Sequence, residues 1–228
     1  VLESQKIPPV KCMNTLRPSA LTNPKPGIYV FDMGQNFAGW ARLRVSAPAG
    51  TAITLRFAET VDKDGMINMD STGVDAIHVE QTDRYICRGG GIEIWEPRFT
   101  YHGFRYVEMT GYPFKPEKEM LEGIVVHTAL DRAGEFACSD SRLNRIHRTA
   151  LWTLTSNLHS VPTDCPAREK CGWLGDAHVM AEMSMLNFDA PVFWAKYVQD
   201  IETNRRSRDG IVEDVAPGRR QEPGTHPD

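Results

Sequence analysis

The chain has 228 residues, which is enough for one large or two modest domains with a hydrophobic core. Apolar residues make up 41% of it and charged residues 25%, as in an ordinary globular protein. The formal net charge is −4 and the basic residues form no stripe, so we expect no nucleic-acid partner.

The N-terminal sequence, VLESQKIPPVK, has no basic stretch followed by an apolar core, so it does not predict a signal peptide. It also does not resemble a natural start, and we expect the chain to be an excised or processed piece, which leaves its localisation unassigned. The sequence contains no run of about 18 apolar residues, which predicts no transmembrane helix and no membrane partner.

The cysteines are scattered along the chain at Cys12, Cys87, Cys138, Cys165 and Cys171. An odd, scattered set does not suggest a disulfide framework. Cys165 and Cys171 have no His at ligand spacing beside them, which argues against a zinc site. We interpret the cysteines as buried free thiols and expect neither a metal ion nor another cofactor.

Residues 28–127 are expected to form strands. The segments WARLRVS (40–46) and ITLRFAE (53–59) alternate apolar and polar residues with the period of a half-buried strand. Turn sequences separate the strand-like segments: APAG at 47–50, DKDG at 62–65, GGG at 89–91 and GYP at 111–113. Short strands at this spacing favour an antiparallel sandwich. Because neither Lys nor a helical pattern follows the three glycines, we interpret them as a hairpin turn rather than a phosphate-binding loop.

The hydrophobic period changes to a helical one after about residue 130. Ser139 is a suitable N-cap for a first helix, and its apolar stripe comprises Leu143, Ile146, Ala150, Leu151, Leu154 and Leu158. A second helix is expected at 175–188, with Met180, Met183 and Leu186 in its stripe. Asp189 and Pro191 predict the start of a third helix. The segment from residue 213 is rich in Pro and Gly, and we interpret it as a long loop.

Between the first two helices lies the segment DCPAREKCGWLGDA (164–177), which has the composition of a sugar-binding loop. Pro162 and Pro166 stiffen the chain, whereas Gly172 and Gly175 permit tight bends that display Trp173. Carboxylates and an arginine can bind several hydroxyls, and an indole face suits the C–H side of a sugar ring.

The three carboxylates of this loop suit different tasks. A carboxyl near other carboxylates and partly desolvated by Trp holds its proton near neutral pH and can act as a general acid. Glu169 suits that role by its reach, while Asp164 and Asp176 would hold hydroxyls as ionised groups. A purely structural alternative stays open, in which Asp176 caps the second helix, Arg168 and Glu169 form a solvated pair, and Trp173 fills a core. A calcium site is disfavoured because ligands at alternate positions are missing.

The loop resembles a segment of the bacterial α-L-rhamnosidases, family 78 of the glycoside hydrolases. The preceding SDSRLNRIHRTALWTLTSNLHSVPT resembles the first catalytic helix of that family. FDMGQNFAGWARLRVSAPAG, LRFAE and EIWEPRFTYHGFRYVEMTG resemble the β-domain that precedes the catalytic domain. The resemblance covers about residues 28–228.

This resemblance implies a six-hairpin (α/α)6 barrel that hydrolyses terminal α-L-rhamnose with inversion. It implies that Glu169 is the proton-donating acid and that Trp173 forms an aromatic wall of the pocket. It further implies that Asp164, Arg168 and Asp176 hold rhamnose hydroxyls. The expected partner is a rhamnose-containing oligosaccharide, polysaccharide or glycoside.

The sequence departs from the family pattern in two ways. Many relatives have two adjacent acidic residues after the arginine, whereas Glu169 is here followed by Lys170. Residues 130–228 are also too few for twelve helices of about 11–12 residues each. The closing THPD resembles the start of a family segment that continues further. The family supplies the general base that inversion requires from later in the chain, so we expect the 228-residue chain alone to hydrolyse little or nothing.

The predicted fold class is an antiparallel, jelly-roll-like β-sandwich followed by α-helical hairpins of an incomplete (α/α)6 barrel. The predicted domains are an extended N-terminal segment (1–27), the sandwich (28–129) and the truncated catalytic domain (130–228). An incomplete barrel would expose an apolar helix face, covered by the missing C-terminal part or in a homo-oligomer. Two other functions stay open: a non-catalytic carbohydrate-binding or structural β-sandwich, and a different glycosidase specificity on the same barrel.

Overall fold

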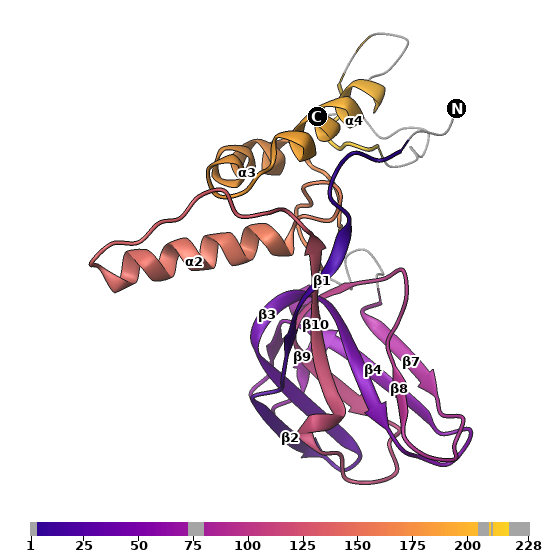
Figure 1. Cartoon of the computed structure of the whole chain (residues 1–228). Coiled ribbons are helices and arrows are strands. Elements are labelled where there is room, and N and C mark those ends of the chain that lie inside the picture. The colour runs from indigo at the N-terminus through magenta and orange to yellow at the C-terminus, as the bar shows by residue number, and fades with distance from the viewer. Residues whose placement is uncertain (1–3, 73–79, 205–209, 211, 219–228) are drawn as a thin grey trace. The chain divides into compact units, whose positions relative to one another are not determined.

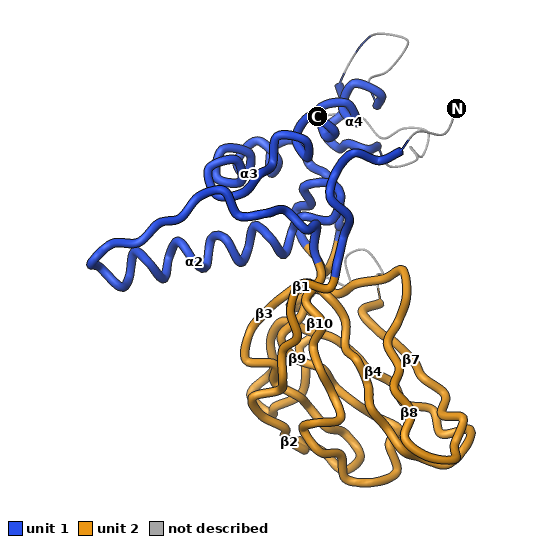
Figure 2. Tube along the Cα trace, in the orientation of Figure 1, with its two compact units in different colours: residues 1–11, 127–165, 169–228 blue, residues 12–126, 166–168 orange. Residues whose placement is uncertain are grey.

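The computed structural model describes residues 4–72, 80–204, 210 and 212–218 (Figure 1). The chain forms two compact units (Figure 2). Unit 1 comprises residues 1–11, 127–165 and 169–228, and unit 2 comprises residues 12–126 and 166–168. The segment THPD, to which the sequence drew attention, lies outside the described residues.

Unit 2 is built from antiparallel strands. The strands are β1 (Val10–Leu16), β2 (Ala20–Lys25), β3 (Ile28–Val45), β4 (Ala52–Ala58), β5 (Thr60–Val61), β6 (Ile67–Asn68), β7 (Thr82–Ile86), β8 (Glu93–Trp95), β9 (His102–Thr110) and β10 (Leu121–Thr128). Two short 3-10 helices, η1 (Met69–Thr72) and η2 (Lys118–Met120), interrupt them. The main sheet has the order β1-β10-β3-β9-β4-β7, with β2 and β8 also paired to β3, while β5 and β6 form a separate pair.

Strand β3 holds the sheet together because its two halves have different partners. The first half pairs with β2 and β9, and the second half pairs with β8 and β10. At Gly39, β3 pairs with both His102 and Val125. A Cβ atom added to Gly39 would lie 1.8 Å from the carbonyl oxygen of Ile124, so only glycine permits this approach. The predicted antiparallel sandwich is thus confirmed, with β3 common to both sets of strands.

The core of unit 2 follows the alternation read from the sequence. Ile53, Leu55 and Phe57 of β4 point inward at every second position and are fully buried. The Phe104 ring lies with its centroid 4.7 Å from that of Phe57 and 4.4 Å from that of Phe37. Aromatic pairs at these distances stabilise a core beyond the area they bury.

Two local predictions for unit 2 need correction. Residues 10–25, expected only as an extended segment, contain strands β1 and β2. The turn at 89–91 does not close a hairpin, because β7 pairs with β4 and β8 pairs with β3. A side chain organises this turn instead: the Glu93 carboxylate accepts hydrogen bonds from the backbone N–H groups of Arg88 and Gly89.

Unit 1 contains the helices α2 (Ser141–Ser156), α3 (Leu174–Asn187) and α4 (Pro191–Asn204) (Figure 1). Its main core is made of buried side chains from the segment before α2, from the helices and from their connections: Ile7, Leu130, Leu151, Leu154, Leu158, Phe188, Ala190 and Phe193. None of the helices in the described ranges combines the length and the apolar composition that a membrane span requires.

The helix starts agree with the sequence prediction to within two residues, but α2 ends at Ser156, so Leu158 of the predicted stripe lies beyond it. Asp140, not Ser139, is the N-cap of α2, because its carboxylate accepts the backbone N–H of Arg142 at 2.8 Å. The predicted stripes are buried only in part. Leu143 and Ile146 of α2 and Leu186 of α3 are half or more exposed, since they lie away from the core of unit 1.

Candidate active site

Asp164 closes the loop between α2 and α3 by pairing with Cys171. The backbone N–H of Asp164 donates to the carbonyl oxygen of Cys171, and its Oδ1 accepts the backbone N–H of Cys171, both at 2.9 Å. The carboxylate that the sequence assigned to sugar hydroxyls therefore also fixes the loop. One of its two carboxylate oxygens is therefore engaged by a hydrogen bond within the loop.

Glu169 is half-buried and is held at both its backbone and its side chain. Its backbone N–H donates to the Cys165 sulfur at 3.2 Å, and its carbonyl oxygen accepts the Cys171 thiol at 3.1 Å. The indole Nε1 of Trp173 donates to Oε2 of Glu169 at 2.8 Å. The carboxyl therefore has a defined direction, as a group that transfers a proton requires.

Lys170, which follows Glu169, has a φ of 54°, in the left-handed region. A non-glycine residue is uncommon there, and such residues cluster at functional sites. This turn brings the carbonyl oxygen of Glu169 and the thiol of Cys171 together within three residues of chain.

Trp173 and Asp176 lie at the start of α3. Trp173 is the N-cap residue but makes no side-chain capping bond, because its indole has a donor and no acceptor, and that donor binds Glu169. It is half-buried rather than buried, so the alternative that it fills a core is not supported. Asp176 lies exposed in the first turn of the helix, so the alternative that it is the N-cap is wrong. A carboxylate in the first turn is favourable to the helix dipole.

Tyr197 of α4 binds the loop through a hydrogen bond to its backbone. The sequence analysis did not single this residue out. Its hydroxyl donates to the carbonyl oxygen of Gly172 at 2.7 Å, and the backbone N–H of Ala216 donates to the same oxygen at 2.8 Å. Burial, together with the negative charges of Asp200 and Asp176, raises the pKa of Tyr197 to about 12, so it remains a donor at neutral pH. A Cβ atom on Gly172 would lie 2.0 Å from the Ala216 carbonyl oxygen, so a larger residue would not fit at this position.

The site residues named from the sequence fall into two groups. Asp164, Glu169, Trp173 and Asp176 all belong to unit 1, and the structure links Glu169 directly to Trp173. Arg168 is exposed and belongs with residues 166–168 to unit 2. Within that unit, Pro166 lies against Gly103, where an added Cβ would approach the proline ring to 2.7 Å.

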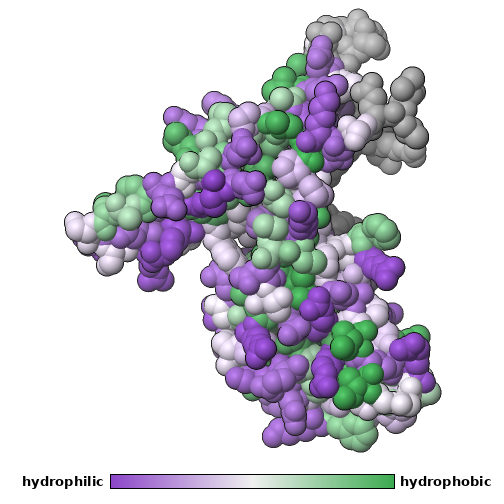
Figure 3. All heavy atoms as spheres, in the orientation of Figure 1, coloured by the Kyte–Doolittle hydropathy of each residue, from purple (hydrophilic) through white to green (hydrophobic). Residues whose placement is uncertain are grey.

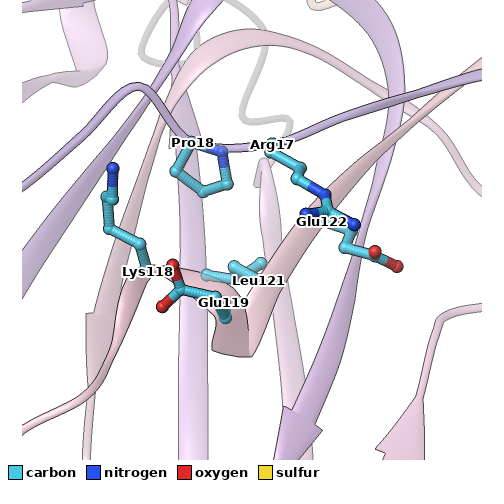
Figure 4. Close-up of a pocket in the computed structure, with 6 residues that line it drawn as sticks. All are labelled: Arg17, Pro18, Lys118, Glu119, Leu121 and Glu122. Atoms are coloured by element: carbon cyan, nitrogen blue, oxygen red, sulfur yellow. The ribbon is translucent and has the colours of Figure 1, made fainter.

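Unit 2 also contains a cavity of about 230 Å³ that the sequence did not indicate (Figure 4). Its lining combines charged side chains with buried apolar ones: Arg17, Pro18, Lys118, Glu119, Leu121 and Glu122. Both signs of charge are present, and Glu122 also pairs with Arg42 at 3.3 Å. The cavity therefore has no evident preference for an anion or a cation.

Comparison with known families matches the chain in two consecutive parts. Residues 22–127 match the bacterial alpha-L-rhamnosidase concanavalin-like domain, and residues 131–228 match the bacterial alpha-L-rhamnosidase 6 hairpin glycosidase domain. The chain belongs to the bacterial α-L-rhamnosidase family. The resemblance read from the loop and from the β-domain is thereby confirmed.

Individual relatives of this α-L-rhamnosidase family agree in sequence and fold. An alpha-L-rhamnosidase of Formosa agariphila is 38% identical over 96% of this chain and 24% of its own length. The structure of the alpha-L-rhamnosidase of Dictyoglumus thermophilum has a TM-score of 0.89 and 46% identity, covering 94% of this chain and 24% of that one. The Streptomyces avermitilis alpha-L-rhamnosidase, complexed with L-rhamnose, has a TM-score of 0.88 and 41% identity over 94% of this chain and 20% of that one. The chain thus spans a quarter or less of the length of these relatives.

Proposed function

We propose that the protein to which these residues belong is an α-L-rhamnosidase, which hydrolyses terminal α-L-rhamnose from a glycoside, oligosaccharide or polysaccharide with inversion. The observation that carries this proposal is the hydrogen bond from Trp173 Nε1 to Glu169 Oε2 at 2.8 Å, inside the loop that carries the family resemblance. A half-buried carboxyl of fixed direction is what a proton donor to a glycosidic oxygen needs.

In the proposed reaction, Glu169 donates its proton to the oxygen that leaves with the aglycone. The indole N–H of Trp173 binds Oε2, so Trp173 orients the carboxyl for this transfer. Water attacks the opposite face of the sugar, activated by a second carboxylate roughly 6.5–9.5 Å from the first. The proton of the water passes to that base, and the product has inverted configuration.

The remaining carboxylates bind the sugar in this proposal. Asp176 is exposed in the first turn of α3 and can accept hydrogen bonds from hydroxyls. The second oxygen of the Asp164 carboxylate and the guanidinium of Arg168 are further candidates for hydroxyl contacts. The indole face of Trp173 would cover the C–H side of the ring, while its N–H orients Glu169.

The test uses a chromogenic aryl α-L-rhamnoside, with the 228-residue chain and with the full product of its reading frame. We expect turnover by the full product, little or none by the 228-residue chain, and a loss of roughly 100- to 10,000-fold in Glu169→Gln. Proton NMR of the first-formed sugar should show the inverted anomer. Full activity in Glu169→Gln would refute the role of Glu169.

The same proteins and variants distinguish two alternative functions. A different specificity would show as faster hydrolysis of another aryl glycoside, such as a fucoside or mannoside. A carbohydrate-binding protein without catalysis would bind rhamnosides but release no aglycone. The cavity of unit 2 supports the second alternative, and substitution of Lys118 by Ala would then weaken binding while Glu169→Gln would not.

A further inference from the structure

Two thiols of the loop contact the same residue, Glu169, on opposite sides of its backbone. Cys165 precedes it by four residues and accepts its backbone N–H, while Cys171 follows it by two and donates to its carbonyl oxygen. Neither cysteine is part of a disulfide, and Cys171 is buried. The sequence analysis had assigned these cysteines no functional role.

These contacts belong to one connected series within unit 1. Asp164 binds the backbone of Cys171 through two hydrogen bonds, both at 2.9 Å. The Cys171 thiol donates a hydrogen bond to the carbonyl oxygen of Glu169, and Trp173 binds the carboxyl of Glu169. The backbone of Glu169 is therefore held by hydrogen bonds to the sulfur atoms of Cys165 and Cys171. Its side chain is held by a hydrogen bond from the indole of Trp173, at the start of α3.

We propose that Cys165 and Cys171 are positioning residues for the general acid, and this inference rests on the proposed role of Glu169. The two thiols fix the peptide groups on either side of its Cα atom. The direction in which the side chain leaves the backbone is thereby fixed before Trp173 orients the carboxyl. A displacement of about 1 Å at a reacting group is enough to lower a rate substantially.

The chemistry of a thiol suits both contacts. Sulfur is a weak acceptor and S–H is a weak donor, so one residue type can serve the N–H on one side and the C=O on the other. A serine hydroxyl retains donor and acceptor capacity on a shorter bond from Cβ. Serine should therefore preserve the contacts in part, whereas alanine removes them.

The test compares two substrates of the full-length protein. An alkyl α-L-rhamnoside has a basic leaving group and depends strongly on protonation, whereas a dinitrophenyl α-L-rhamnoside has a weakly basic one and needs little. Misplacement of the acid should lower kcat on the alkyl substrate selectively. Damage to the fold or to sugar binding should lower both rates together.

We expect Cys165→Ala and Cys171→Ala to lose roughly 10-fold in kcat on the alkyl rhamnoside, with less than about 3-fold loss on the dinitrophenyl substrate and an unchanged KM. The serine variants should recover most of that loss. Cys138→Ala is the matched control, because its thiol also donates to a backbone carbonyl, that of Asp140, but at an exposed position away from Glu169. It should behave as the wild type.

Two results would count against the inference in distinguishable ways. Equal losses on both substrates in the cysteine variants, with a selective loss in Glu169→Gln, would overturn the positioning role and leave the proposed function intact. Equal losses on both substrates in Glu169→Gln itself would show that Glu169 is not the acid, and the proposed function would fall with the inference.

Discussion

Lys170 has a backbone conformation that restricts which residues can follow the proposed acid. With a φ of 54°, its left-handed geometry is tolerated by Gly and Asn but strains a β-branched side chain. We expect Lys170→Val to lower the free energy of unfolding by about 1–2 kcal/mol and to lower kcat as well. Lys170→Asn should be close to the wild type. Urea denaturation and rate measurements on both variants provide the check, and equal behaviour of Val and Asn would contradict it.

Trp173 can be tested for its two roles separately, because the ring and the N–H act on different partners. Trp173→Phe keeps an aromatic face but removes the donor to Glu169. Glu169 becomes charged as it gives up its proton, and a hydrogen bond to a charged group is worth about 1.5–3 kcal/mol, so kcat should fall by roughly 10- to 100-fold with little change in KM. Trp173→Ala should raise KM as well. A phenylalanine variant with wild-type kcat would show that the indole N–H has no part in the reaction.

The sequence predicted these residues by type and spacing but could not predict how they contact one another. DCPAREKCGWLGDA indicated a sugar site and pointed to Glu169, and the family is confirmed. The bond between Trp173 and Glu169 depends on the turn at Lys170 and on the start of α3 at Leu174. Tyr197 lies 25 residues from its partner Gly172, so no local pattern could reveal it.

At the scale of single elements, Glu93 organises the turn between β7 and β8 in unit 2. Its carboxylate accepts hydrogen bonds from the Tyr85 hydroxyl at 2.6 Å and from two backbone N–H groups, and these bonds lower its pKa from 4.5 to about 2. Because the folded-state pKa is below the ordinary value, the ionised group stabilises the fold above pH 4.5. That stabilisation is lost as the pH falls from 4.5 toward 2.

We therefore expect Glu93→Gln to be less stable than the wild type at neutral pH, and the difference to shrink at about pH 3. Urea denaturation midpoints at the two pH values measure it. Glu119→Gln, at an exposed position, is the control and should show no such convergence. A difference between Glu93→Gln and wild type that is constant with pH would mean that the charge of Glu93 does not stabilise the turn.

The elements of the sheet were predictable where one face is buried and less so elsewhere. The alternation in ITLRFAE matched β4, because Ile53, Leu55 and Phe57 all enter the core. Strands β1 and β2 have mostly exposed side chains, so they carry no such alternation and were missed. The partners of β3 change at Gly39, and periodicity holds no information about pairing.

At the scale of the whole molecule, large apolar side chains lie on the surface of both units (Figure 3). In unit 1 they include Leu143, Ile146, Val179, Met185, Leu186, Val192 and Val198 on the three helices. The helical stripes were predicted from the sequence as core. An exposed apolar helix face is what the sequence analysis expected of an incomplete barrel.

This surface should make the 228-residue chain associate with itself. Val179 is 79% exposed and Leu186 is 68% exposed, and both line a groove of about 470 Å³ in unit 1 together with Phe136 and Met183. Seven residues apart on α3, they lie on the same side of the helix. We expect sedimentation analysis to show concentration-dependent association of the wild type and a shift toward monomer in the double variant Val179→Lys, Leu186→Lys.

Ile94 provides the matched control, because it is 67% exposed but lies on β8 of unit 2. Ile94→Lys introduces one lysine at similar exposure and should leave the association unchanged. If Ile94→Lys alone produced monomers while the α3 double variant still associated, the contact would lie on the sheet unit. The exposed helix face would then be tolerated in water, and its apolar composition would not be the cause of association.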